Sequence, residues 1–260
     1  SQELINAGVD YLGVAYLEEA VFLRNQGISA PILVLGAINT EQIADFLRYN
    51  VEITSSSLEK SRAISRVASS LSKTARVHLK IDTGMERIGV HWYNAERFVG
   101  DSLEMANIET VGVFSHLAKA ESDGGFTGTQ ITRFDHMVEF LSRRGTLPEY
   151  IHMANSAGII NHKDSHYNMV RPGIMLYGYN PNGYHPNVRF DGTPLKPVMT
   201  LKSKVSYFKV CPPSTGISYN HSFITDRQTR IVTLPVGYGD GYCRLFSNRG
   251  EVIIGHKRYP

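Results

Sequence analysis

The stretch that decides the fold class is residues 11–55, YLGVAYLEEAVFLRNQGISAPILVLGAINTEQIADFLRYNVEITS. Runs rich in β-branched and aromatic residues at 11–16, 31–36 and 51–55 alternate here with segments of helical pattern. We expect the helix within 39–50 to begin at a Thr40 cap that Gln42 supports. This alternation predicts a parallel sheet whose faces are covered by helices.

The same alternation continues further along the chain. Additional strands are predicted at 75–82 and 109–116, and near 150–154 and 168–171. The total is seven strands, whereas a closed (β/α) barrel has eight. The first of the seven begins at residue 11, close to the start of the given sequence, so we expect the missing strand to lie before Ser1. The prediction is an α/β fold of the TIM type, a (β/α)8 barrel that lacks its first strand here. An open doubly wound sheet of seven strands is the alternative.

The pattern changes after Tyr177. The segments at 197–213 and 230–242 alternate at period two and are punctuated by Pro and Gly, which is typical of β-structure. We predict a barrel over residues 1–185 and the first part of a mostly β C-terminal domain over 190–260. The chain starts at Ser1 without Met and stops within an apolar run, so we expect segments to be missing at both ends.

Composition excludes several classes of protein. The chain has 260 residues, a formal charge of +3 and no run of five like charges, so neither a nucleic acid nor a membrane surface is an expected partner. It contains two cysteines, too few for a disulfide framework, and no apolar stretch of the ~20 residues that a membrane helix needs. We expect a cytoplasmic globular protein.

Polar residues gather at the ends of the predicted strands. Lys80 and Asp82 lie in one strand and Arg87 follows it, while His116 ends the next strand and His152 lies in a later one. Active sites of (β/α) barrels lie at the C-terminal ends of the strands. Each residue alone has a structural explanation; Lys80 and Asp82, for example, could form an ion pair. Their convergence favours an active site.

Residues 152–178, HMANSAGIINHKDSHYNMVRPGIMLYG, predict a phosphate site. Asn155 and Ser156 follow one strand, and Arg171, Gly173 and Ile174 end the next. Backbone N–H groups at two such turns, with the Ser156 hydroxyl, could surround a phosphate, and Arg171 would then face the group that carries it. An ordinary pair of glycine turns with a salt-bridged arginine is the alternative.

Six motifs together resemble the alanine racemase family in order and spacing. They are LKIDTGMERIG (79–89), SHLAKA (115–120), HMANSAG (152–158), VRPGIMLYG (170–178), GISYNHSF (216–223) and LPVGYGDGY (234–242). The resemblance implies an isomerase that uses pyridoxal 5'-phosphate (PLP), built as an eight-stranded barrel followed by a β-domain. It further implies interconversion of L- and D-alanine, which supplies D-alanine for peptidoglycan.

The resemblance also assigns roles around the cofactor. Asn155, Ser156, Gly173 and Ile174 correspond to residues that bind PLP, the last three to its phosphate cradle. Arg171 corresponds to the arginine that faces the pyridine nitrogen.

Further residues correspond to those that act on the substrate. His116 matches the histidine that bridges this arginine and a catalytic tyrosine, and Arg87 matches the arginine near the substrate carboxylate. Lys80 matches a lysine that is carbamylated in many relatives. Tyr219 matches the tyrosine that acts on one face of the α-carbon and reaches the other subunit's cofactor, which implies a homodimer with shared active sites.

Parts of the family pattern are missing, namely a lysine motif, a later cysteine-methionine-aspartate motif and a C-terminal tyrosine. Relatives bind PLP through a lysine in a Lys-x-Asn-x-Tyr run on the first barrel strand, and none of the ten lysines here stands in such a run. We therefore expect an internal fragment of a racemase with little or no activity alone. In the complete protein, that lysine and Tyr219 would serve as the two bases.

Three alternatives remain open. The first is a racemase for serine or another small amino acid, and the second is a non-catalytic PLP-binding protein of cofactor homeostasis. The third is a metal-dependent barrel hydrolase that would use His116, His152, His162 and His166. We expect no metal site, because no His-x-His pair ends a strand and residues 162–166 fit a solvated loop.

Overall fold

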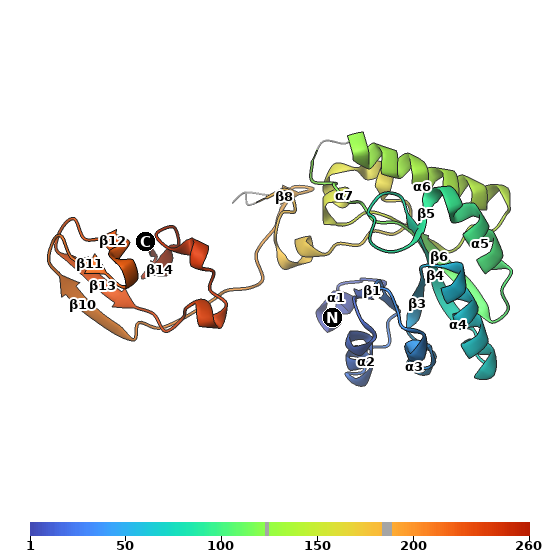
Figure 1. Cartoon of the computed structure of the whole chain (residues 1–260), viewed down its shortest axis with the longest axis horizontal. Helices are drawn as coiled ribbons and strands as arrows, with labels where there is room; N and C mark the ends of the chain where they lie inside the picture. The colour runs from blue at the N-terminus through green and yellow to red at the C-terminus, as the bar shows by residue number, and fades with distance from the viewer. Residues whose placement is uncertain (123–124, 184–188) are drawn as a thin grey trace. The chain divides into compact units, whose positions relative to one another are not determined.

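Six parallel strands form a curved sheet in the first part of the chain (Figure 1). The computed structural model describes residues 1–122, 125–183 and 189–260, which divide into two units, 1–198 and 199–260. In the first unit the strand order is β1-β2-β3-β4-β6-β7, so each strand lies beside its predecessor. Their bounds are β1 (Leu12–Val14), β2 (Ile32–Val34), β3 (Glu52–Ser55), β4 (Ala75–Asp82), β6 (Ile108–Phe114) and β7 (Tyr150–His152), and the short β5 (Val90–His91) pairs with the end of β4.

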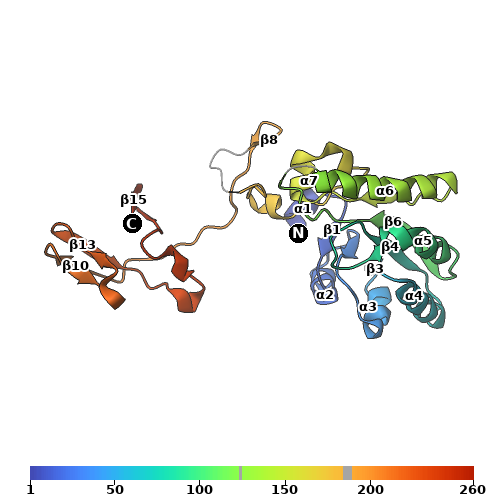
Figure 2. The same cartoon turned by 45° about the horizontal axis from the view of Figure 1, so that its top comes forward.

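Helices connect these strands and lie along the outer face of the sheet (Figures 1 and 2). A doubly wound sheet would carry helices on both faces, so this one-sided cover identifies a curled half-barrel and confirms the TIM-type prediction. The helices are α1 (Gln2–Asn6), α2 (Leu17–Asn25), α3 (Ile43–Arg48), α4 (Leu58–Ser70), α5 (Ala95–Leu103) and α6 (Gly125–Arg143), with 3-10 turns η1 (Thr40–Gln42) before α3 and η2 (Trp92–Asn94) before α5.

Local sequence signals fix where the helices begin. The Ser57 hydroxyl caps α4 by accepting a hydrogen bond from the Lys60 backbone N–H at 3.1 Å. Before α3, the side chain of Gln42 accepts from the Asn39 backbone N–H at 3.2 Å, so Asn39 is the capping residue. The predicted Thr40 cap is therefore wrong by one residue, because Thr40 already belongs to η1.

The two faces of the central strands carry different residue types. The face toward the helices holds apolar side chains that are at most 1 % exposed, in β4 Val77, Leu79 and Ile81. Burying each such side chain stabilises the fold by about 1.5–3 kcal/mol relative to its exposed state. The opposite, inner face of β3 and β4 holds polar side chains that are also buried, at most 5 % exposed: Glu52, Thr54, His78, Lys80 and Asp82. The half-barrel thus has an apolar outside and a polar inside.

The strand predicted near 168–171 is wrong as a full strand. Only one parallel bridge forms there, between His152 and Met169, followed by a hydrogen bond from the Arg171 N–H to the Ala154 carbonyl at 3.0 Å. The next residue, Pro172, has no N–H to extend the ladder. Arg171 is therefore the last residue of this segment whose backbone N–H is hydrogen-bonded to the chain just after β7.

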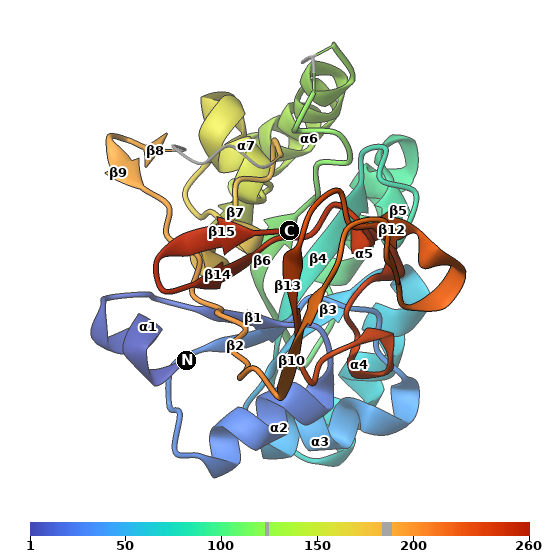
Figure 3. The same cartoon turned by 90° about the vertical axis from the view of Figure 1, so that its left-hand side faces the viewer.

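The second unit consists mostly of short antiparallel hairpins (Figure 3). Among its described residues only Cys211 and Thr225 are buried. The elements of the second unit are β10 (Tyr207–Cys211), β11 (Gly216–Ile217), η5 (Tyr219–His221), β12 (Phe223–Ile224), β13 (Thr229–Thr233), η6 (Tyr238–Asp240), η7 (Arg244–Phe246), β14 (Val252–Ile254) and β15 (Lys257–Tyr259). The hairpin of β8 (Arg189–Phe190) and β9 (Thr193–Pro194) belongs to the first unit.

No helix in the described parts of the chain is long and apolar enough to cross a membrane.

Candidate active site

Asp82 organises the loop that carries Arg87. One carboxylate oxygen accepts hydrogen bonds from the backbone N–H groups of residues 84, 85 and 86 at 2.8–3.2 Å, and the other accepts from the Arg87 N–H at 3.3 Å. Burial alone would raise the pKa of Asp82, but these four N–H groups hold it below its ordinary value. The loop also requires Gly89, whose φ is 117° and whose Cβ would press against Lys80.

Lys80 is an isolated buried amine. Its side chain is 3 % exposed, and its Nζ lies 4.2 Å from the centre of the Phe114 ring. No carboxylate of the described residues lies within ion-pair distance of this Nζ, and Asp82 is engaged by the loop, so the alternative explanation of a Lys80–Asp82 ion pair is wrong. Burial, with the nearby charges of Arg171 and Arg87, lowers the pKa of Lys80 well below its usual range. The uncharged, nucleophilic amine is thereby favoured.

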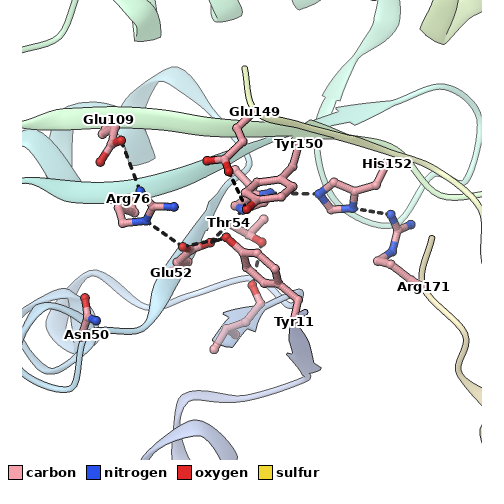
Figure 4. A network of polar contacts seen from close by, with 12 residues as sticks. Tyr11, Asn50, Glu52, Thr54, Arg76, Glu109, Glu149, Tyr150, His152 and Arg171 are labelled. Carbon is pink, nitrogen blue, oxygen red and sulfur yellow. Dashed lines mark hydrogen bonds and ion pairs between the residues drawn. The ribbon is translucent and has the colours of Figure 1, made fainter. Parts of the chain in front are cut away.

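Arg171 is held entirely by neutral acceptors in the described structure, and Figure 4 shows its contact with His152. Its Nη2 donates to the Ser115 carbonyl at 2.8 Å and the Met153 carbonyl at 3.1 Å, and its Nη1 faces His152 Nδ1. The alternative of a salt-bridged arginine is wrong, because no described carboxylate contacts it. Burial lowers the pKa of Arg171 to about 9, which still leaves it charged at neutral pH.

His116 lies beside Arg171. Its Nδ1 is 3.4 Å from Arg171 Nη2. Burial, followed by the charges of Arg171, Lys80 and Arg87, lowers the pKa of His116 to about 3. The ring is therefore neutral at pH 7, and Nδ1 can accept a hydrogen bond from the guanidinium.

The turns after β7 and after Arg171 face one another. Asn155 caps the short helix α7 (Ser156–Asn161), since its side-chain oxygen accepts from the Gly158 N–H at 3.0 Å. The Ser156 hydroxyl accepts from the Gly173 N–H at 2.9 Å and from the Met175 N–H at 3.3 Å. Gly173 leads into η4 (Ile174–Tyr177), which begins with the predicted Ile174. Two backbone N–H groups thus already converge on one oxygen atom. Backbone N–H groups arranged in this way are the donors that bind a phosphate oxygen.

These residues fit PLP. The N–H groups around Ser156 suit its phosphate, and a Cβ on Gly173 would meet nothing nearer than Ser156 Oγ at 3.8 Å, so there is space at this turn. Arg171 is a fixed donor that suits a ring nitrogen. Arg87 adds a positive charge on the side of β4, and Lys80 adds a buried amine.

Tyr219 is the one predicted site residue that belongs to the second unit. It begins η5 and is 88 % exposed. The other eight predicted residues lie in the first unit, where Arg87 is exposed on its loop and Lys80 is buried.

The sequence analysis does not identify three buried polar residues: one lies in α6, and the other two lie on the inner face of β3 and β4. Gln130 of α6 donates to Thr83 Oγ1 at 3.2 Å and to the His116 carbonyl at 3.1 Å, so it ties two site loops together. Glu52 and His78 form a further pair at 2.9 Å. A signal for the last two existed: polar residues at every second position of 52–54 and 78–82 predict one polar face on otherwise apolar strands.

The segment 162–166 is more ordered than the predicted solvated loop. It contains the 3-10 turn η3 (Lys163–Ser165), and Ser165 is fully buried. His162 and His166 contact the carbonyls of Ala120 and Ile159 at 3.2 and 3.1 Å. Among the residues that the structure describes, no three His, Cys, Asp or Glu side chains are placed to bind one metal ion.

Comparison with known proteins gives one consistent family. The model for "Alanine racemase, N-terminal domain" matches residues 1–181, and that for "Alanine racemase, C-terminal domain" matches residues 198–260. The alanine racemase of Carboxydothermus hydrogenoformans is 42 % identical over 260 residues, which are 100 % of this chain and 70 % of that protein.

Solved structures agree with the sequence matches. The alanine racemase of Clostridium difficile 630 superposes with a TM-score of 0.88 at 35 % identity, covering 99 % of this chain and 67 % of that one. A histidine racemase from Leuconostoc mesenteroides is more distant, with a TM-score of 0.78 at 26 % identity over 92 % of this chain and 63 % of that one.

Proposed function

The chain belongs to the alanine racemase family, and from this premise we propose that it forms the PLP site and supplies one catalytic base of an enzyme that interconverts L- and D-alanine. The observation that carries the proposal is the pair of N–H groups that converge on Ser156 Oγ, next to an arginine held by neutral acceptors. The 42 % identity to an alanine racemase over the whole chain supports alanine over serine as the substrate.

The phosphate of PLP would bind at the turns around Ser156 and Gly173. An incoming phosphate would take over the hydrogen bonds that Gly173 and Met175 now give to Ser156 Oγ, and the hydroxyl would become a further donor. Asn155 would keep the turn in place through its cap on Gly158.

Arg171 would donate to the ring nitrogen of PLP. When bound, PLP supplies an electron-poor ring that accepts negative charge from the substrate α-carbon. A guanidinium donates a hydrogen bond but does not supply a proton, so the ring nitrogen stays unprotonated. The negative charge then remains nearer the α-carbon, which favours its reprotonation over transamination.

Arg87 would bind the carboxylate of the substrate, and Lys80 would orient Arg87. A neutral Lys80 amine can attack the carbon of CO₂: an N–C bond forms, one C=O π bond opens to a carboxylate, and the nitrogen releases one proton to solvent, so that the neutral amine becomes an anionic carbamate. Burial favours this uncharged amine, and the carbamate would be stabilised by the charges of Arg171 and Arg87.

Tyr219 would act as the base on one face of the α-carbon. A phenol acts as a base only as the phenolate, which a cationic neighbour stabilises. We propose that it works at the site of a second copy in a homodimer, where the Arg171 guanidinium, with the neutral His116 ring beside it, would stabilise the phenolate. An exposed tyrosine in a unit with few buried residues is available for such a contact.

The biological setting is part of the same proposal. D-alanine is a building block of peptidoglycan, and both cysteines, buried Cys211 and exposed Cys243, are free thiols, which suits the cytoplasm. A cofactor-homeostasis protein with only the barrel would not account for the match to the C-terminal racemase domain.

Two measurements test the function. PLP should bind this chain and be displaced by phosphate. A chimera, in which the chain is joined to the flanking segments of the C. hydrogenoformans relative that carry the family's Schiff-base lysine, should convert L-alanine to D-alanine. No PLP binding, or a folded chimera that binds PLP without racemising alanine, would contradict the proposal.

A further inference from the structure

Four side chains form a continuous hydrogen-bonded line across the inside of the half-barrel, and we call them the buried relay: Glu52, His78, His152 and Arg171. Glu52 Oε2 lies 2.9 Å from His78 Nε2, and His78 Nδ1 lies 2.9 Å from His152 Nε2. His152 Nδ1 lies 2.5 Å from Arg171 Nη1. The relay therefore leads from the first residue of β3 to the site arginine, and Figure 4 shows its two ends.

The two ends of the relay determine the direction of every hydrogen bond in it. A guanidinium can only donate and an ionised carboxylate can only accept. His152 Nδ1 must then be unprotonated, so its Nε2–H donates to His78 Nδ1. His78 Nε2–H in turn donates to Glu52. Both rings must be neutral and must carry their proton on Nε2, because any other arrangement places two N–H groups face to face.

The surroundings keep Glu52 ionised and His78 in place. Tyr11 donates its hydroxyl to both oxygens of Glu52 at 2.9 Å, and Arg76 Nε donates to Oε1 at 2.8 Å. Burial alone would raise the pKa of Glu52, but its bonds to His78 and Arg76 hold it below its ordinary value. A Cβ at Gly112 would overlap the His78 ring, so glycine in β6 leaves the space that this ring occupies.

Both rings are buried in a way that favours the neutral form. His78 and His152 are fully buried, and burial is the main cause that lowers the pKa of each. The Phe114 ring stacks on His152 with a centroid distance of 4.7 Å and fixes its plane. A neutral, oriented imidazole thus faces the guanidinium.

We propose that Glu52, His78 and His152 are positioning residues for Arg171: the carboxylate fixes the tautomers of two imidazoles, and the unprotonated His152 Nδ1 orients the guanidinium. The consequence for PLP rests on the proposed function, whereas the relay itself does not. Glu52 acts on the site arginine without touching it.

The first test is nitrogen NMR of the cofactor-free chain with ¹⁵N-labelled histidine. His78 and His152 should each show one protonated nitrogen, Nε2, and one unprotonated nitrogen, Nδ1, with the same pattern from pH 6 to 8. A proton on Nδ1 of either ring, or a charged ring at pH 7, would overturn the proposal.

The second test breaks the relay in its middle. In His78→Gln an amide can still accept from His152 and donate to Glu52, whereas in His78→Leu neither bond exists. The Leu variant should leave His152 Nε2–H without an acceptor, shift the Arg171 guanidinium signals and weaken PLP binding about tenfold. The Gln variant should restore both. Equal behaviour of the two variants, in signals and in affinity, would contradict a positioning role.

A matched control separates the relay from general electrostatics. Glu109 also contacts Arg76, at 3.2 Å, but does not contact His78. Glu109→Gln should leave the His152 and Arg171 signals unchanged, and a change equal to that in His78→Leu would contradict the relay.

If the tautomers are as inferred but PLP does not bind, the proposed function fails and the relay stands. If PLP binds but the tautomers differ, the relay fails.

Discussion

The Ser156 hydroxyl accepts a hydrogen bond from the Gly173 backbone N–H at 2.9 Å, although 17 positions separate the two residues in sequence. The contact joins the N-terminus of α7 to the turn that follows Arg171. It holds backbone donors together before any ligand is present, so a phosphate would meet a largely preformed site. The phosphate end of the proposed PLP site is thereby linked to the arginine that would contact its ring.

Ser156→Ala should weaken PLP binding by about tenfold, because one donor to the phosphate is lost and the turn loses its internal acceptor. Fluorescence titration of the chain with PLP measures this effect, and pyridoxal, which has no phosphate, should be insensitive to the change. Ser61→Ala removes a buried hydroxyl of α4 that bonds to Ser55 and Ser102, away from this turn, and serves as the control. An equal loss in both variants would argue against a phosphate role.

Lys80 should carry a carbamate when bicarbonate is present. ¹³C NMR of the chain in labelled bicarbonate should show one slowly exchanging carbamate carbon that disappears in Lys80→Gln. Lys73→Gln is the control, because Lys73 precedes β4 and its Nζ donates to the Leu47 carbonyl. A carbamate signal that survives Lys80→Gln would assign the modification elsewhere.

Much of the architecture could be predicted from alternation along the chain, because helices between buried strands leave a clear periodic signal. The last strand of the half-barrel could not. Its residues 168–171 include the apolar pair Met169 and Val170, but Pro172 and the turn at Gly173 reduce the pairing to one bridge. The Asn39 cap was missed for a similar reason, since Thr40 and Asn39 are both capping residue types and only the Gln42 contact distinguishes them.

The site was predictable where residues are close in sequence and less so where the fold brings them together. The turns at Ser156 and Gly173 follow from strand ends. The alternative of a Lys80–Asp82 ion pair could be excluded only from the structure, because a carboxylate two residues from a lysine suggests such a pair and sequence does not show the backbone N–H groups of the next loop. Glu52 belongs to β3 and His78 to β4. The two side chains meet because of the register of these strands, in which Thr54 lies opposite His78.

Asp82→Asn should destabilise the fold by about 1–3 kcal/mol, because an amide replaces the acceptor of four N–H groups and its NH₂ would face the Arg87 N–H. Urea denaturation gives the stability, and hydrogen exchange should speed up at Gly84, Met85 and Glu86. Asp101→Asn changes only an exposed pair with Arg97 at 3.9 Å and should have little effect. Unchanged exchange in the loop would contradict the proposed role of Asp82.

Stability should fall as the pH is lowered below about 6.5. Burial lowers the pKa of His78, His116 and His152 in the folded state, that of His116 to about 3. Between this lowered pKa and the ordinary histidine pKa of about 6.5, the unfolded state therefore binds more protons than the folded state. Stability then rises with pH in this range, by at most about 1.4 kcal/mol per pH unit for each histidine. Denaturation midpoints at pH 7.5 and 5.5 measure the loss. His116→Gln should reduce the dependence, exposed His136→Gln should not, and a flat profile in the wild-type chain would contradict neutral buried rings.

Tyr219→Phe tests the second base and the subunit arrangement in the chimera with the racemase flanking segments. If Tyr219 exchanges the α-proton on one face and the added lysine on the other, deuterium from the solvent should still enter one enantiomer of alanine and should enter its mirror image about 10²–10⁴-fold more slowly. Tyr219→Trp would also remove the phenol and should match it, whereas Tyr238→Phe, an exposed tyrosine of the same unit, should leave both exchange rates unchanged. Mixing Tyr219→Phe subunits with subunits that lack the lysine should restore one intact site per mixed dimer, because each variant supplies what its partner lacks. An inactive mixture whose mixed dimers are verified by native mass spectrometry would show that Tyr219 does not serve the site of a second copy.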